Sequence, residues 1–195
     1  MTSPVPAQDQ PTRIVGLGGA LRRGSSTEKA LECALEMARE LGAETQILTG
    51  SDIALPPFTP DADTRTSEAT RLVDELRNAD GVILASPAYH GGISGLIKNA
   101  LDYIEDLRLD ERTYLSGRGV GCVVTAGGPQ ASVTTLSSLR SIIHSLRGWP
   151  TPLGVTICAS SPIFDEKNQC TDDVIHASLE TMVNEVVWFA RRMNG

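Results

Sequence analysis

The chain has 195 residues, of which 41% are hydrophobic and 21% are charged, so it is long enough for one domain with a full core. Its formal net charge of -7 argues against nucleic-acid binding as its main function, and no apolar stretch approaches the roughly 18 residues needed to span a bilayer. The N-terminal sequence also lacks the basic start and apolar run of a secretory signal. From the charge and the lack of a long apolar stretch, we expect neither a nucleic-acid nor a membrane partner.

Five short apolar runs are predicted to be strands. Most are continuously apolar rather than alternating, which is typical of parallel strands covered on both faces. Amphipathic helical patterns lie between the strands and after the last one. The predicted strands are 13–18, 45–49, 81–86, 119–125 and 152–158, and the predicted helices are 28–42, 67–78, 94–107, 130–147 and 172–193.

This β–α order, repeated five times, predicts a three-layer α/β sandwich with a parallel sheet. Right-handed crossovers favour a flavodoxin-like, five-stranded sheet in the order 2-1-3-4-5. Residues 1–12 are rich in Pro, Gln, Ser and Asp and are predicted to be a flexible lead, and residues 13–195 are predicted to form a single domain. Long loops are predicted over 51–66 and 160–171.

The four cysteines are Cys33, Cys122, Cys158 and Cys170, and no two of them form a C-x-x-C pair. Three lie in apolar or helical surroundings, which predicts buried, reduced thiols. Reduced thiols indicate a cytoplasmic protein and give no support for a zinc ion or an iron–sulfur cluster.

Three glycine-containing loops are predicted to meet at one edge of the sheet. In sheets of this type, ligands bind beyond the carboxyl ends of the strands, at the switch point between the first and third strands. The first loop, GLGGALRRGSST, combines amides at a helix start with an arginine and with Ser and Thr hydroxyl groups, which is typical of a phosphate site. It lacks the ending of a Walker loop and the third glycine of a dinucleotide fingerprint. The alternative is a set of ordinary helix caps beside a surface arginine.

The second loop lies within SPAYHGGISGLIKNALDY. Pro87 is predicted to direct the chain out of the third strand and to place Tyr89 and His90 at the loop apex. Gly91 and Gly92 would let backbone amides approach a flat ligand without interference from side chains. The alternatives are that Tyr89 covers the loop surface and that His90 is an exposed or hydrogen-bonded residue.

The third loop, TAGGPQ, follows the fourth strand and exposes two further glycine amides. Three such loops on one edge indicate a ligand with a phosphate at one end and a planar ring at the other. Flavin mononucleotide (FMN) fits this description.

These stretches resemble the signature loops of the NAD(P)H-dependent FMN reductases. GGALRRGSST resembles the family's phosphate loop, SPAYHGGISGLIKNALDY its second and more specific signature, and TAGG its third loop. FDEKNQCTDD resembles the C-terminal segment, so the resemblance covers nearly the whole chain from Arg13 to about Phe189. The sequence departs from the family at three positions, where Ala20 replaces a serine, Thr27 replaces an asparagine and His90 stands where Asn, Lys or Ser is common.

The resemblance implies a role for each matching residue. Arg22, Ser25 and Thr27 would hold the FMN phosphate. Pro87, Tyr89, His90 and Gly91 would line the isoalloxazine ring, and Gly127 and Gly128 would approach its other edge or the ribityl chain. Gly18, Ala88 and Thr125 complete the predicted cofactor-binding set.

The resemblance also implies an NAD(P)H-dependent FMN reductase, which moves hydride from NADPH or NADH to FMN and passes electrons to a small-molecule acceptor such as a free flavin, a quinone or an azo compound. Such a reaction needs no catalytic acid or base from the protein, and His90 is the sole candidate proton donor. The alternatives are a flavodoxin-type electron carrier, an FMN-dependent dehydrogenase or oxidase of a biosynthetic pathway, and an FMN-binding regulatory protein. The moderate charge and the glycines after Tyr89 favour an enzyme over a carrier.

The resemblance implies a homodimer or homotetramer as well. Tyr103, Ile104 and Trp149 are expected to present an apolar face to a partner subunit.

Overall fold

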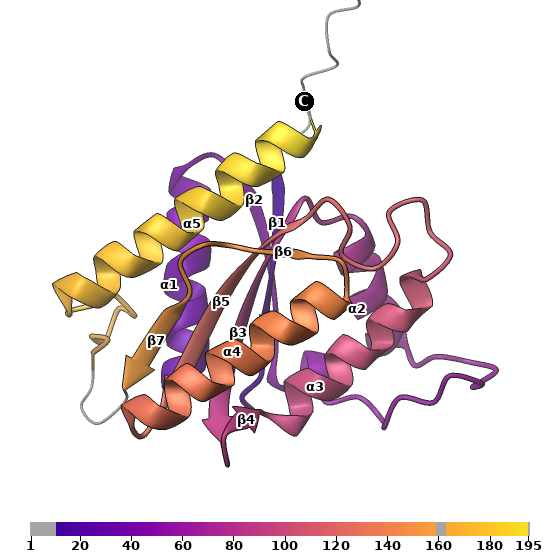
Figure 1. The fold of residues 1–195 in the computed structure, drawn as a ribbon, viewed down its shortest axis with the longest axis horizontal. Helices are drawn as coiled ribbons and strands as arrows, with labels where there is room; N and C mark the ends of the chain where they lie inside the picture. Colours follow the sequence, from indigo (N-terminus) through magenta and orange to yellow (C-terminus); the bar gives the residue numbers. More distant parts are fainter. Residues whose placement is uncertain (1–10, 159–162, 195) are drawn as a thin grey trace, which may run out of the picture.

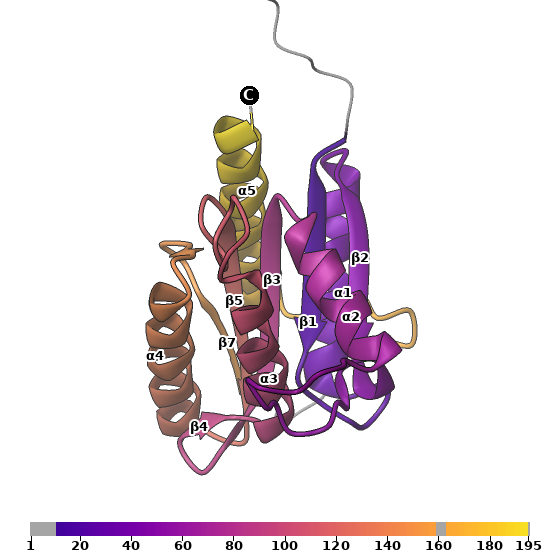
Figure 2. The same cartoon turned by 90° about the vertical axis from the view of Figure 1, so that its right-hand side faces the viewer.

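The computed structural model describes residues 11–158 and 163–194. Residues 1–10, which make up most of the predicted flexible lead, lie outside the described residues, as do residues 159–162 of the region around the last predicted loop. The described chain forms one twisted sheet with helices on both faces (Figures 1 and 2). This arrangement confirms the predicted α/β sandwich.

The sheet has the order β2-β1-β3-β5-β6, with every neighbouring pair on this path parallel. Its strands are β1 (Arg13–Gly18), β2 (Glu44–Thr49), β3 (Gly81–Tyr89), β5 (Gly119–Ala126) and β6 (Trp149–Pro150), while β7 (Val155–Cys158) also pairs with β5 and β4 (Gly92–Ile93) pairs with β3. Counted over the five predicted strands, the order is the predicted 2-1-3-4-5, the flavodoxin-like arrangement.

Over residues 11–158 and 163–194, the sheet nevertheless has seven strands rather than the predicted five. The predicted fifth strand over 152–158 begins only at Val155, as β7, and β6 is a separate short strand before it. The two are separated by an interruption, and β6 pairs with the start of β5 while β7 pairs with its end. Pro150 and Pro152 lie in or beside the interruption, and a proline has no N–H to donate to a neighbouring strand. The seventh strand, β4, arises from the chain beyond Pro87.

The prediction that Pro87 directs the chain out of β3 is wrong. The strand continues to Tyr89, with Pro87 paired to Thr125, and then folds back antiparallel through His90 and Gly91 into β4. Both turn residues have positive φ, 52° at His90 and 83° at Gly91. This is the conformation of a type I′ hairpin turn, which glycine adopts readily and histidine tolerates.

The continuous apolar runs are explained by burial on both faces. Along β1, Ile14 packs on one side with helices α1 (Ser26–Glu40) and α5 (Asp173–Asn194), while Val15 packs on the other. That other core is closed by α2 (Ser67–Arg77), α3 (Gly95–Asp102) and α4 (Pro129–Ser145). Successive strand residues therefore all enter a core, which favours an unbroken apolar sequence.

Two 3₁₀ segments refine the predicted boundaries. The predicted helix over 94–107 is α3 followed by η2 (Tyr103–Leu107), and the predicted loop over 51–66 begins with η1 (Gly50–Ile53). Asn99 ties this loop to α3, because its side chain accepts the Phe58 N–H at 2.8 Å and donates to two loop carbonyls. The loop is therefore held against the helix that borders the predicted site.

Burial corrects two surface predictions. Tyr103 and Ile104 are buried in the core and present no face to a partner, whereas Trp149 is 60% exposed. All four cysteines are free; Cys122 is buried, Cys33 and Cys170 are partly buried, and Cys158 is exposed, contrary to the prediction for that residue. Within the described residues, we find no helix with the length and apolar character needed to cross a membrane.

Candidate functional site

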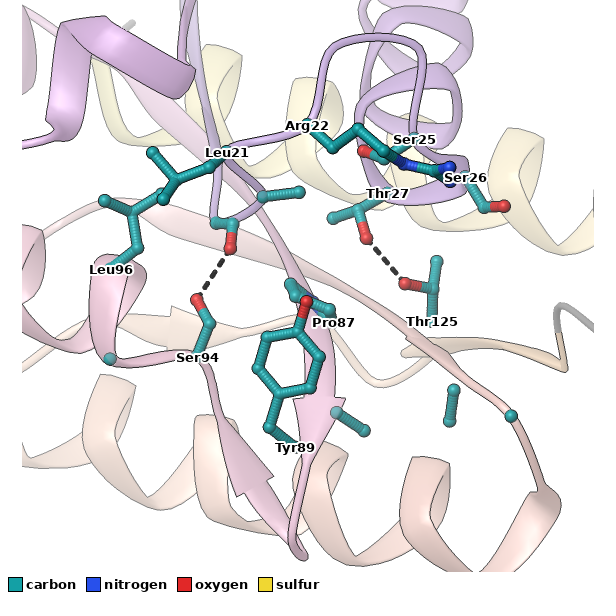
Figure 3. Close-up of a pocket in the computed structure, with 16 residues that line it drawn as sticks. Leu21, Arg22, Ser25, Ser26, Thr27, Pro87, Tyr89, Ser94, Leu96 and Thr125 are labelled. Carbon is teal, nitrogen blue, oxygen red and sulfur yellow. Dashed lines mark hydrogen bonds between the residues drawn. The ribbon is translucent and has the colours of Figure 1, made fainter.

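A cavity of about 540 Å³ lies at the carboxyl edge of the sheet, between the three predicted loops (Figure 3). Its volume falls within the roughly 300–1,000 Å³ typical of small-molecule sites. The cavity is lined by the loop after β1, the start of α1, the end of β3 and the end of β5. Residues Ser94–Leu96 at the start of α3 also line it. The lining residues are Gly19, Ala20, Leu21, Arg22, Ser25, Ser26, Thr27, Pro87, Ala88, Tyr89, Ser94, Gly95, Leu96, Thr125, Ala126 and Gly127.

Among the described residues, the first loop gives the cavity its single charged lining residue. Arg22 is exposed and forms no ion pair with any described residue, and Figure 3 shows its side chain extending beside Ser25 and Ser26. Ser25 is the N-cap of α1, and its hydroxyl accepts the Glu28 N–H at 3.2 Å. A helix N-terminus, hydroxyl groups and a guanidinium therefore lie together, which is a suitable environment for an anion.

A buried hydrogen bond joins the first and third loops. The hydroxyl oxygens of Thr27 and Thr125 lie 2.6 Å apart, although the two residues are 98 positions apart in the sequence. Because each hydroxyl carries one proton, one threonine donates in this bond and the other keeps its proton available for a ligand. Figure 3 shows the pair on the Arg22 side of the cavity.

A second bond joins the first loop to α3. Ser94 is only 3% exposed, and its hydroxyl donates to the Gly19 carbonyl at 2.7 Å while accepting the Ile97 N–H at 3.2 Å as the N-cap of α3. The Ser94 N–H in turn donates to the Ser86 hydroxyl at 3.0 Å. A Cβ on Gly19 would lie 2.7 Å from the Ser94 Oγ, so this approach requires glycine.

The β3–β4 hairpin places Tyr89 at the cavity mouth. Tyr89 is 59% exposed, and Figure 3 shows its ring between Ser94 on one side and Thr125 on the other. His90 and Gly91 form the tip of the hairpin and do not line the cavity. Their conformation sets the turn that brings Tyr89 to the site.

The third loop leaves its backbone open. A Cβ on Gly127 or Gly128 would meet no atom within 4 Å, so both glycines border free space. Gly127 lines the cavity, while Gly128 serves as the N-cap of α4 and lies outside the lining. Gly18 also lies outside it, because it packs against β2, where a Cβ would lie 2.7 Å from the Thr49 side chain.

The structure thus brings together eight of the predicted residues around the cavity: Arg22, Ser25, Thr27, Pro87, Ala88, Tyr89, Thr125 and Gly127. The lining residues that our prediction missed include Gly19, Ser94 and Leu96. Ser94 is the serine of the S-G pair in the second signature, and this pair could have identified it as a site residue from the sequence. The missed set is Gly19, Ala20, Leu21, Ser26, Ser94, Gly95, Leu96 and Ala126.

No carboxylate, imidazole or thiol lines the cavity in the described part of the chain. Over the same residues, no group of three or more His, Cys, Asp and Glu side chains is placed to hold a metal ion. What the cavity offers is binding and orientation, through amides, hydroxyl groups, one cation and apolar surface.

Comparison with known proteins gives a consistent picture. The family model for NADPH-dependent FMN reductases matches residues 12–161. The chain is 27% identical over 179 residues to the NADPH-dependent FMN reductase ArsH of Shigella flexneri, covering 92% of this chain and 69% of that protein. It is 31% identical over 133 residues to the FMN-dependent NADPH-azoreductase of Staphylococcus haemolyticus, covering 67% of each.

The fold has close counterparts among solved structures. The flavoenzyme NAD(P)H:(acceptor) oxidoreductase FerB of Paracoccus denitrificans superposes with a TM-score of 0.78 at 21% identity, over 93% of this chain and 98% of that one. At this level of identity, the likeness shows that the two chains share a fold.

Proposed function

Because the chain belongs to the NADPH-dependent FMN reductase family, it is a flavin-dependent oxidoreductase that uses FMN and NADPH, and we propose that the cavity in Figure 3 is its FMN site. One observation carries this proposal: a single cavity is lined by an arginine that pairs with no described residue, a helix N-terminus, an aromatic ring and open glycine backbone.

The residues present fit a phosphorylated, planar ring compound. At the polar end, Arg22, Ser25, Ser26 and Thr27 would hold the phosphate, with amides at the start of α1. At the apolar end, Pro87, Tyr89 and Leu96 would contact the ring, and Gly127 would let backbone approach it.

The remaining predicted residues act indirectly in this proposal. Gly18 packs the loop against β2, and Gly128 starts α4. His90 and Gly91 form the hairpin turn that positions Tyr89, and we assign His90 no role as a proton donor, since it does not line the cavity.

When bound, FMN supplies the hydride and electron chemistry of the reaction. The chain binds and orients the cofactor and excludes water from it. Because no acidic or basic side chain other than Arg22 lines the cavity, we propose no catalytic acid or base from the described residues.

The acceptor is a small molecule. We propose that it is planar, of the free flavin, quinone or azo class, because the exposed ring of Tyr89 leaves the cavity mouth accessible to a flat compound. The same opening supports an enzyme over an electron carrier or a regulatory protein, neither of which needs access to a substrate. A named relative that acts as an azoreductase supports the azo class in particular.

We further propose that residues 13–195 work as a single FMN-binding domain in the cytoplasm, as a homodimer or homotetramer. Trp149 and Trp188 are 60% and 61% exposed, and exposed tryptophans near one another support a surface that a partner subunit covers.

The phosphate assignment is tested by Arg22→Ala, with Arg23→Ala as the matched control, since Arg23 is an exposed neighbour that does not line the cavity. Loss of one charge-assisted contact should weaken FMN about tenfold, while riboflavin, which lacks the phosphate, should bind both variants as it binds the wild type. Flavin fluorescence titration measures both affinities, and absorbance changes on adding NADPH follow reduction. Equal FMN affinities in the two variants would refute the assignment of Arg22.

A further inference from the structure

A carboxylate is built into the back of the first loop. We propose that Glu28 weakens the hold of this loop on the FMN phosphate, so that the cofactor exchanges with solution. This inference rests on the proposed FMN site and concerns how tightly that site holds its ligand.

The position of Glu28 is fixed by three hydrogen bonds. Its Oε2 accepts the Gly24 N–H at 2.5 Å, and its Oε1 accepts the Thr49 hydroxyl at 3.1 Å. Its own N–H donates to the Ser25 hydroxyl at 3.2 Å. Ser25 and Glu28 have the S-x-x-E spacing of a capping box, but the carboxylate bonds to the residue before the N-cap instead of to the N-cap itself.

The first consequence concerns the donors of the loop. Backbone N–H groups before a helix are the usual ligands of a phosphate, and Gly24 lies between Arg22 and Ser25, which both line the cavity. The Gly24 N–H already donates a hydrogen bond to the Glu28 Oε2. A phosphate at this loop therefore has one amide fewer to bind.

The second consequence concerns charge. Glu28 is half-buried, and its carboxylate forms no ion pair with a described residue. Arg22 is the one cation among the described lining residues, and Glu28, which is bonded to Gly24, adds a negative charge to the same loop. A carboxylate bonded to this loop repels a phosphate dianion bound by the loop, and partial burial reduces screening by water.

The same carboxylate also holds the loop in place. It connects Gly24 to Thr49 at the end of β2. In the sheet, β1 lies between β2 and β3, the strand that carries Tyr89. Glu28 is thus a positioning residue as well as a repelling charge, and an experiment must separate the two effects.

Glu28→Gln separates them. The glutamine carbonyl oxygen can accept the Gly24 N–H, and its amide can donate to the Thr49 hydroxyl, so both connections are retained while the charge is removed. We expect FMN to bind about threefold to tenfold more tightly, with unchanged riboflavin affinity and with a gain that shrinks at high salt. Glu36→Gln is the matched control, because Glu36 is exposed on the same helix two turns further on and should change neither affinity.

The quantity to compare is the ratio of the riboflavin Kd to the FMN Kd, measured by fluorescence titration, with stopped-flow dissociation rates beside it. Glu28→Ala removes charge and connection together; because the loop holds the phosphate, its loosening weakens FMN and not riboflavin, so the ratio should be lower in this variant than in Glu28→Gln. A ratio in Glu28→Gln equal to that of the wild type, or below it, would overturn the inference. If wild-type protein bound no FMN, the proposed function itself would fail, which is a distinguishable result.

Discussion

Ser94 is the residue through which the first loop of the site depends on helix α3, and its replacement by alanine tests that dependence. The hydroxyl caps α3 and donates to the buried Gly19 carbonyl. Loss of an N-cap costs about 1 kcal/mol, and a buried carbonyl left without its donor costs about 1–2 kcal/mol more. The free energy of unfolding should therefore fall by about 2–3 kcal/mol, which lowers the Tm of a chain of this length by about 5–10 °C.

Thr66→Ala is the matched control for this variant. Thr66 caps α2 in the same way, with its hydroxyl accepting the Ala69 N–H at 3.2 Å, but it is exposed and tied to no site loop. It should cost only the cap, about 1 kcal/mol. Thermal and urea unfolding followed by circular dichroism give both values, and flavin titration should show weaker FMN binding in Ser94→Ala alone. If Ser94→Ala were no less stable than Thr66→Ala, the bond to Gly19 would contribute nothing and the reasoning would be refuted.

Two further predictions concern titratable groups. Burial raises the pKa of Cys122 to about 12, so its thiol should resist iodoacetamide in the folded protein, while the exposed Cys158 reacts. Peptide mass spectrometry measures the labelling of both residues, and early labelling of Cys122 would contradict its burial. Burial, assisted by the nearby Glu28 carboxylate, also raises the pKa of Glu32 above its ordinary value of 4.5. The folded chain therefore binds this proton more tightly than the unfolded chain does. As the pH rises from 4.5 through the raised pKa, ionisation of Glu32 lowers the free energy of unfolding. Glu32→Gln, which retains an acceptor for Asn168, should therefore gain stability relative to wild type as the pH rises above 4.5. Urea unfolding at a series of pH values measures this difference, and a difference that stays constant with pH would count against the shift.

Much of the molecule follows from local sequence. Continuous apolar runs separated by amphipathic helical patterns are sufficient for a parallel sheet with covered faces, and right-handed crossovers leave few strand orders. The carboxyl ends of parallel strands meet at one edge, so the loops that carry Arg22, Tyr89 and Gly127 had to lie near one another. The S-x-x-E spacing of Ser25 and Glu28 is likewise visible in the sequence alone.

Tertiary structure alone decided how these loops are held and which side chains face the cavity. Because Pro87 pairs with Thr125, β3 continues past the proline, and His90 forms a hairpin turn and does not line the cavity. The bonds from Ser94 to Gly19 and from Thr27 to Thr125 join residues 75 and 98 positions apart. Local propensity contains no information about such partners, because each hydroxyl group finds its acceptor only after the strands between them have assembled into the sheet.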